Sequence, residues 1–243
     1  MIAALDVELR KLRGSLALLL AVVAPALPGL LAALSIASTD RTSQWASVYT
    51  QFIMPIWCLF LAPMVVAAFT ALIGQIEYRA RGWDHQRSLP IATWRLPLAK
   101  ALIALTAFAA MTALVLAFAW IGASIGGALG GHPPAGAFPW TRLARTVPLV
   151  LAGSTMLVVI QLWSALRFPS FVIPLVVGIG GTLVSMAVAM TRTDQADWFP
   201  WVLPFRILSA PDPVPYATFG LIGGFVLLGA MVFDLSRHSF RTA

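Results

Sequence analysis

The 243-residue chain is 60% hydrophobic and only 10% charged, and its formal net charge is +7. Average soluble proteins carry about 25% charged residues, and a soluble fold of this length could not bury so much apolar surface in one core. The basic residues lie at the edges of apolar runs and form no contiguous basic face, which argues against nucleic-acid binding. Cys58 is the single cysteine, which excludes an intrachain disulfide and a cysteine-based metal site.

Residues 1–13 precede the first apolar run and predict a short amphipathic helix that lies along a membrane interface. Its expected apolar face comprises Ile2, Leu5, Leu9 and Leu12, and its polar face comprises Asp6, Arg10 and Arg13. The alternative is a secretory signal peptide. The apolar run that follows, residues 15–37, is longer than the roughly 7–15 residues of a signal peptide's apolar region, which favours an uncleaved span.

Six apolar runs are long enough to cross a bilayer, for which about 20 residues are needed. They cover residues 15–37, 48–76, 98–128, 145–166, 169–190 and 216–234. The first, second and fifth runs contain no charged residue, as expected when a charge near mid-bilayer costs about 2.5–3.5 kcal/mol. Prolines within the runs predict bent helices, because neighbouring groups can satisfy the freed carbonyls. The sequence therefore predicts an all-α integral membrane protein with one domain over residues 1–243.

Lysine and arginine predict the orientation of the chain. With the N-terminus in the cytoplasm, most of the 16 basic residues fall on cytoplasmic segments, as the positive-inside rule requires. Six spans then return the C-terminus to the cytoplasm, and the expected location is the cytoplasmic (inner) membrane of a bacterium. The last external segment, residues 191–215, contains Trp198, Phe199 and Trp201 and is too apolar for a solvated loop. We expect it to re-enter the outer interface in part.

Polar residues within the spans predict packing contacts rather than catalysis. The three histidines lie on connections on different sides of the membrane, and no H-E-x-x-H motif occurs, which argues against an intramembrane zinc protease. Gln161 is the most polar residue deep in a span, where it would bond to a neighbouring helix or contact a cargo. Asp234 is expected to pair with Arg237, three residues further along the same helix.

Glycines at intervals of four residues predict places where helices approach closely. Two spans carry this pattern: Gly122, Gly126 and Gly130 in one, and Gly220 and Gly224 in the other. The spacing arises readily in alanine-rich helices. Packing within the molecule is therefore favoured over a dedicated dimer face.

The connection between the second and third spans, residues 75–97, is the segment best suited to contact another protein. It interleaves charged residues with Trp83, Leu89 and Trp94, whereas a plain connector would need neither this length nor large aromatics. The mixture predicts an amphipathic coupling helix that docks on a partner, because tryptophan and arginine are enriched at interfaces. The alternative is a loop anchored at the membrane surface.

This connection resembles the corresponding one in ABC type-2 permeases, particularly in the bacteriocin (lantibiotic) immunity and export branch. In that family a glutamate follows the second span, then come a Gly/Asn-Trp-like step and a Leu-Pro-Ile/Val turn, and a lysine opens the third span. The matching residues here are Glu77, Gly82, Trp83, Leu89, Pro90, Ile91 and Lys100. The arginine-rich stretch 79–87 departs from relatives that carry asparagine and lysine there. The topology of the whole chain also resembles that family.

The resemblance implies a permease of an ATP-driven exporter, with an amphipathic or hydrophobic cargo such as an antimicrobial peptide or a drug. Two copies, identical or related, would pair around the translocation path. Each would dock a separate ATP-binding subunit, since this chain lacks the G-x-x-x-x-G-K-[ST] loop that holds ATP. The expected docking residues are Glu77, Arg81, Trp83, Arg87 and Leu89. The alternatives are a membrane-embedded enzyme or maturation factor and a scaffold subunit of a membrane complex.

Overall fold

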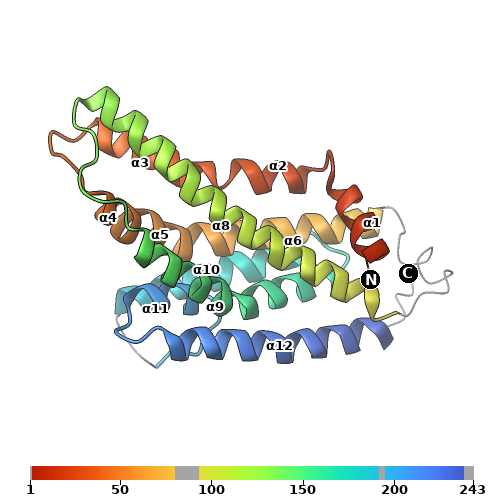
Figure 1. Cartoon of the computed structure of the whole chain (residues 1–243). Helices are drawn as coiled ribbons and strands as arrows, with labels where there is room; N and C mark the ends of the chain where they lie inside the picture. Colours follow the sequence, from red (N-terminus) through yellow and green to blue (C-terminus); the bar gives the residue numbers. More distant parts are fainter. Residues whose placement is uncertain (1, 80–92, 192–194, 238–243) are drawn as a thin grey trace.

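The computed structural model describes residues 2–79, 93–191 and 195–237, and these residues fold into helices without strands (Figure 1). Six helical stretches are long and apolar enough to span a membrane. They are Leu16–Ala37, Trp45–Tyr78, Arg95–Gly130, Trp140–Arg167, Val172–Thr191 and Val214–Arg237. The prediction of an all-α six-span membrane protein is confirmed, with limits that differ by a few residues.

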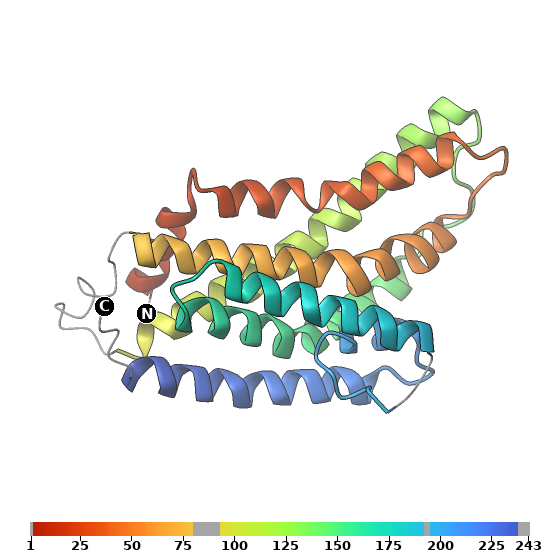
Figure 2. The same cartoon turned by 180° about the vertical axis from the view of Figure 1, so that it is seen from behind.

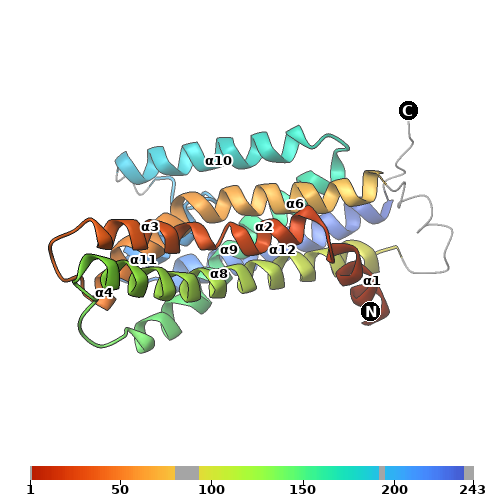
Figure 3. The ribbon, with the colours of Figure 1, turned by 90° about the horizontal axis from the view of Figure 1, so that it is seen from above.

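The first span is bent and follows a separate N-terminal helix. Helix α1 (Ile2–Leu12) is followed by Gly14, whose φ of 73° permits the sharp turn into α2 (Leu16–Val23). The chain then bends at Pro25 and continues as α3 (Ala26–Ala37), because proline supplies no N–H to continue the helical ladder. In consequence α1 turns away from the axis of α2 at one end of the bundle (Figure 3), which we call the α1 end.

The second span contains two π-helical stretches, each directly before a proline-containing turn. It runs through α4 (Trp45–Ser47), η1 (Val48–Ile53), α5 (Met54–Ile56), η2 (Trp57–Leu61) and α6 (Ala62–Arg79). The N–H of Met54 bonds to the carbonyl of Tyr49, five residues back, and Pro55 comes next. A wider turn moves the backbone away from the proline ring, which would otherwise collide with the preceding turn. The predicted bending therefore takes the form of wide turns in this span.

The remaining spans are α8 (Arg95–Gly130), α9 (Trp140–Arg167), α10 (Val172–Thr191) and α12 (Val214–Arg237). At a rise of 1.5 Å per residue, α8 is about 54 Å long, well beyond a hydrocarbon core of about 30 Å. Its far half leans away from the bundle together with α3 (Figure 1). Helix α10 covers α6 and α9 on the opposite side (Figure 2).

Close backbone contacts hold two pairs of spans together. A Cβ added at Gly122 of α8 would collide with the carbonyl of Gly29 on α3, and one added at Gly220 of α12 would collide with the carbonyl of Gly153 on α9. The predicted use of these glycines for packing within the molecule is confirmed. The outward faces carry exposed large apolar side chains, such as Val176 of α10, which suit contact with lipid.

The segment after α10 folds back onto the bundle. Its short helix α11 (Leu203–Ser209) packs on α9 and α12, and the ring of Trp201 lies against Gly181 of α10. An ion pair of 2.6 Å between Arg206 Nε and Asp197 Oδ1 links α11 to the residues that follow α10. The predicted re-entry into a bilayer is compatible with this packing and stays a prediction.

Candidate functional site

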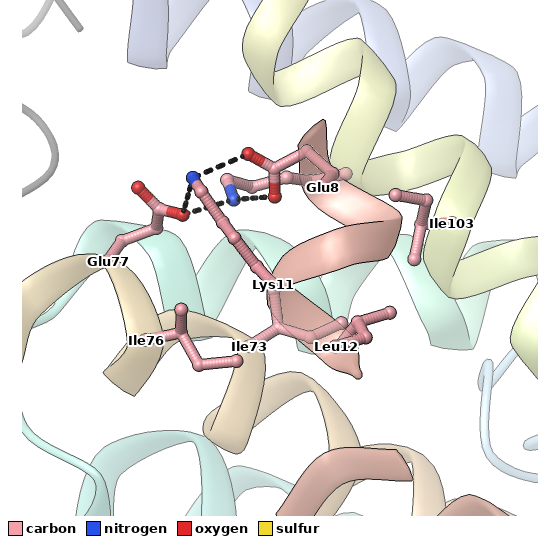
Figure 4. Close-up of a pocket in the computed structure, with 8 residues that line it drawn as sticks. Glu8, Lys11, Leu12, Ile73, Ile76, Glu77 and Ile103 are labelled. Atoms are coloured by element: carbon pink, nitrogen blue, oxygen red, sulfur yellow. Dashed lines mark hydrogen bonds and ion pairs between the residues drawn. The ribbon is translucent and has the colours of Figure 1, made fainter. Parts of the chain in front are cut away.

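Four charged side chains meet at the α1 end of the bundle (Figure 4), and we call them the charge quartet. Glu8 and Lys11 come from α1, Glu77 from the last turn of α6, and Lys100 from the second turn of α8. Lys100 Nζ lies 2.5 Å from Glu8 Oε2 and 2.7 Å from Glu77 Oε1. Lys11 Nζ lies 2.8 Å from Glu8 Oε1 and 2.8 Å from Glu77 Oε1. Each lysine thus bridges both carboxylates, and the quartet is neutral.

The quartet is buried among isoleucines. The side chains of Glu77 and Lys100 are 1% exposed, whereas that of Lys11 is 28% exposed. The surrounding side chains include Ile73, Ile76 and Ile103, and the cavity left between them is about 10 Å³, at the lower limit for one water. An unpaired charge in such surroundings would be costly, so the four groups depend on one another.

The charge of Lys11 is also favoured by its partners. Burial alone would lower its pKa, but the hydrogen bonds and charges of Glu77 and Glu8 together raise the pKa above its ordinary 10.5. Lys11 is therefore protonated at neutral pH, and both carboxylates keep two cationic neighbours.

Helix α1 turns a charged residue toward the bundle. Glu8 is buried, whereas Val7 and Leu9 are exposed at 51% and 52%. The predicted helix is present, and its position along a membrane interface stays a prediction, with which the exposure of Leu9 is compatible. Glu8 and Lys11 are three residues apart and so share a face, and their pairing with Lys100 and Glu77 decides the rotation of the helix.

The quartet fixes both ends of the connection between the second and third spans. Glu77 lies two residues before the end of α6, and Lys100 lies in the second turn of α8. The hydroxyl of Tyr78 also donates to the carbonyl of Leu166 on α9 at 2.6 Å. A displacement of the connection would therefore pass directly to α1, α6 and α8. The arrangement can carry a mechanical signal across three helices.

Of the five expected docking residues, the structure describes one. Glu77 belongs to the quartet, and its carboxylate faces the interior. Arg81, Trp83, Arg87 and Leu89 lie outside the described residues. Docking through this segment stays a prediction, in which Glu77 would hold the base of the segment in place.

Gln161 of α9 is fully buried against α10. With its amide oriented to satisfy both neighbours, Nε2 donates to the carbonyl of Pro174 at 3.1 Å, and Oε1 accepts from the N–H of Gly178 at 3.0 Å. The expected bond to a neighbouring helix is thus present. A contact with cargo stays a prediction and would require α9 and α10 to separate.

Asp234 of α12 has a different partner from the one expected. Its Oδ2 accepts from Trp163 Nε1 at 2.9 Å and lies 3.4 Å from Arg167 Nε, both on α9. The guanidinium of Arg237 lies instead 3.9 Å from the centroid of the Phe233 ring. The predicted pairing of Asp234 with Arg237 was wrong, because close packing of α12 along α9 brings Arg167 within reach.

Sequence reasoning missed Glu8 and Lys11 as members of the site and took Lys100 only as part of a motif. One signal was available. Lys11 and Lys100 are the two lysines of the chain, and Lys100 begins a long apolar run. An ionisable residue at such a position needs a partner, and Glu77 is the acidic residue at the matching end of the preceding span.

The chain was compared with known proteins. The model of one family, described as ABC-2 family transporter protein, matches residues 4–203. That range contains all four residues of the charge quartet and the whole connection between the second and third spans. No curated protein matches the chain, and no solved structure matches it.

Proposed function

The chain belongs to the ABC-2 family of transporter proteins and is a multi-pass membrane permease subunit, and on that premise we propose that it exports an amphipathic or hydrophobic cargo with energy from a separate ATP-binding subunit. An antimicrobial peptide removed from the membrane is the cargo class we favour, following the resemblance of residues 75–97 to the bacteriocin immunity branch. Two copies, identical or related, form the translocation path.

The observation that carries this proposal is the position of the charge quartet. The ATP-binding subunit docks on residues 75–97, with Arg81, Trp83, Arg87 and Leu89 in direct contact. When ATP closes the partner subunits, the docked segment moves. Because Glu77 and Lys100 are locked to α1 at 2.8 Å or less, the first three spans move with the segment.

A groove between α3 and η1 supports the choice of cargo. Its volume is about 280 Å³, and it combines the hydroxyls of Ser35 and Ser47 with the side chains of Gln51, Ile36 and Phe52. Uncharged hydrogen-bonding groups beside apolar ones suit a molecule that arrives from the lipid with both kinds of surface. Gln161 provides a second polar contact if α9 and α10 separate during transport.

The test is co-purification of the chain with the ATP-binding subunit from its native membrane. The complex should hydrolyse ATP, and the chain alone should not. Trp83→Ala and Arg87→Ala should reduce recovery of the partner about tenfold, as expected for interface residues that contribute more than 1 kcal/mol each. Trp140→Ala is the matched control, because Trp140 is 71% exposed at the opposite end of the bundle. Equal recovery of the ATP-binding subunit with all three variants would refute the docking assignment.

A further inference from the structure

A cavity of about 220 Å³ lies at the end of the bundle opposite the charge quartet. It is formed by the start of the second span, the first two turns of α9 and helix α11. The residues that line it include Thr50, Met54, Arg142, Arg145, Thr146 and Ile207. The volume is below the roughly 300–1,000 Å³ of a pocket for a drug-sized ligand, and it suits a small polar group with a short apolar extension.

The cavity carries two guanidinium groups without a counter-ion. Arg142 and Arg145 are both exposed, and neither forms an ion pair within the described ranges 2–79, 93–191 and 195–237. Arg206, at the same end, is paired with Asp197. Asp212 follows the rim residue Pro211, and its Oδ1 accepts from the N–H of Val214 at 3.1 Å. Its single negative charge is smaller than the two positive charges of the arginines. The cavity therefore has an excess of positive charge.

The start of α9 adds to this positive potential. The helix runs for 28 residues, has no acidic residue in its first turn and receives no side-chain cap from Pro139. Unbonded N–H groups and the aligned peptide dipoles place a partial positive charge at this end of the helix. Both arginines project from this same helix, so the charges reinforce one another.

The floor of the cavity is apolar. Met54 and Ile207 are buried at 1% and 3% exposure, and both line the cavity. The hydroxyl of Thr146 forms no hydrogen bond to any part of the chain that the structure describes. That of Thr50 donates to the carbonyl of Ala46 at 2.8 Å and keeps its oxygen lone pairs. A ligand that carries an anionic group, a hydroxyl group and a short apolar chain would match the arginines, the threonine hydroxyls and the apolar floor of the cavity.

We propose that this cavity binds the phosphate headgroup of an anionic lipid. Guanidinium groups match phosphate oxygens in planar, two-bond geometry, and two of them line the same cavity here. The apolar floor accepts the first carbons of the lipid, which a free phosphate ion lacks. The position also fits, because α9 begins with exposed Trp140, and tryptophan concentrates where spans meet headgroups.

The experiment measures lipid binding to the purified full chain in detergent, by native mass spectrometry and by the shift in melting temperature. The three probes are phosphatidylglycerol, phosphatidylcholine and inorganic phosphate. The double variant Arg142→Gln/Arg145→Gln should weaken phosphatidylglycerol binding about tenfold or more, since a hydrogen bond to a charged group contributes roughly that factor. Arg41→Gln is the matched control, because Arg41 is exposed in the connection between α3 and α4 and does not line the cavity.

Equal weakening by Arg41→Gln and by the double variant would overturn the proposal, because it would show attraction by general surface charge. Equal affinity for phosphatidylcholine would also overturn it. Inorganic phosphate that binds as tightly as phosphatidylglycerol would overturn the assignment to a lipid. Recovery of the ATP-binding subunit tests only residues 75–97, so the two proposals can fail separately.

Discussion

Lys100 contacts both carboxylates of the charge quartet from α8, at 2.5 and 2.7 Å, and its side chain is 1% exposed. In Lys100→Met, Glu8 and Glu77 would share the single ammonium of Lys11. Removal of one partner of a buried ion pair costs about 3–5 kcal/mol, because it leaves an uncompensated charge. We expect Lys100→Met to lower the melting temperature of the purified chain strongly, as measured by scanning fluorimetry in detergent.

Two further variants separate this effect from a general loss of charge. Glu77→Gln/Lys100→Met restores neutrality and leaves the Glu8–Lys11 pair, so it should be more stable than Lys100→Met alone. Asp6→Asn removes the exposed pair between Arg10 and Asp6, which is expected to contribute about 0–1 kcal/mol. A melting temperature as low in Asp6→Asn as in Lys100→Met would contradict the assigned importance of the quartet.

Lys11 gives the quartet a pH dependence in the alkaline range. Burial lowers its pKa, but Glu77 and Glu8 outweigh burial and raise the pKa above 10.5 in the folded chain. The folded state therefore holds this proton more tightly than the unfolded state does. The stabilisation is complete below pH 10.5 and is lost as the pH rises through the folded pKa.

The check is the melting temperature between about pH 8 and pH 11.5, with each variant compared with its own value at pH 8. The wild-type chain should lose stability above pH 10.5. Lys11→Arg should lose less, because arginine stays protonated throughout this range. Identical alkaline losses in the two proteins would show that Lys11 does not contribute as described.

At the level of the helices, the close approach of α3 to α8 depends on Gly122 of α8, which faces the backbone of α3 at Gly29. Gly122→Ala would place a methyl group against the carbonyl of Gly29, and a forced fit of this kind costs about 1–3 kcal/mol. Gly180→Ala is the matched control, because nothing lies within 4 Å of an added Cβ there, and alanine favours the helix by up to about 1 kcal/mol. We expect the first variant to melt earlier and the second to melt at the same temperature or later.

The positions of the spans were predictable from the sequence, because the local pattern of apolar residues decides them. Uninterrupted apolar runs determine where spans lie, so residues 48–76 were assigned correctly although Pro55 and Pro63 lie within them. The rotation of α1 was not predictable in the same way. Periodicity groups Leu9 with the other apolar residues of α1, but it does not show which side of the helix meets the bundle. The ion pair of Glu8 with a lysine 92 residues away buries Glu8 and decides this.

At the level of the whole molecule, the candidate site depends on contacts that no local pattern reports. The motif after the second span identified Glu77, because a short stretch of sequence carries it. Glu8, Lys11 and Lys100 come near Glu77 only after α1, α6 and α8 have packed together. The sequence around an ionisable residue near a span does not show which residue will pair with it. The arginines without an ion pair at the start of α9 were likewise visible only once the positions of Asp197 and Asp212 were known.

At the same scale, the proposal for ATP-driven transport predicts the orientation of the molecule in the membrane, since the ATP-binding subunit would work in the cytoplasm. The α1 end carries the charge quartet and the end of α12 (Figure 1), so we expect both to face the cytoplasm. Buried Cys58 can be replaced by alanine, and single cysteines can then be placed at exposed Arg13, Arg237 and Thr42. A membrane-impermeant maleimide applied to intact cells should label Thr42→Cys alone, and permeabilisation should add Arg13→Cys and Arg237→Cys. The reverse pattern would place residues 75–97 outside the cell, where no ATP-binding subunit could dock.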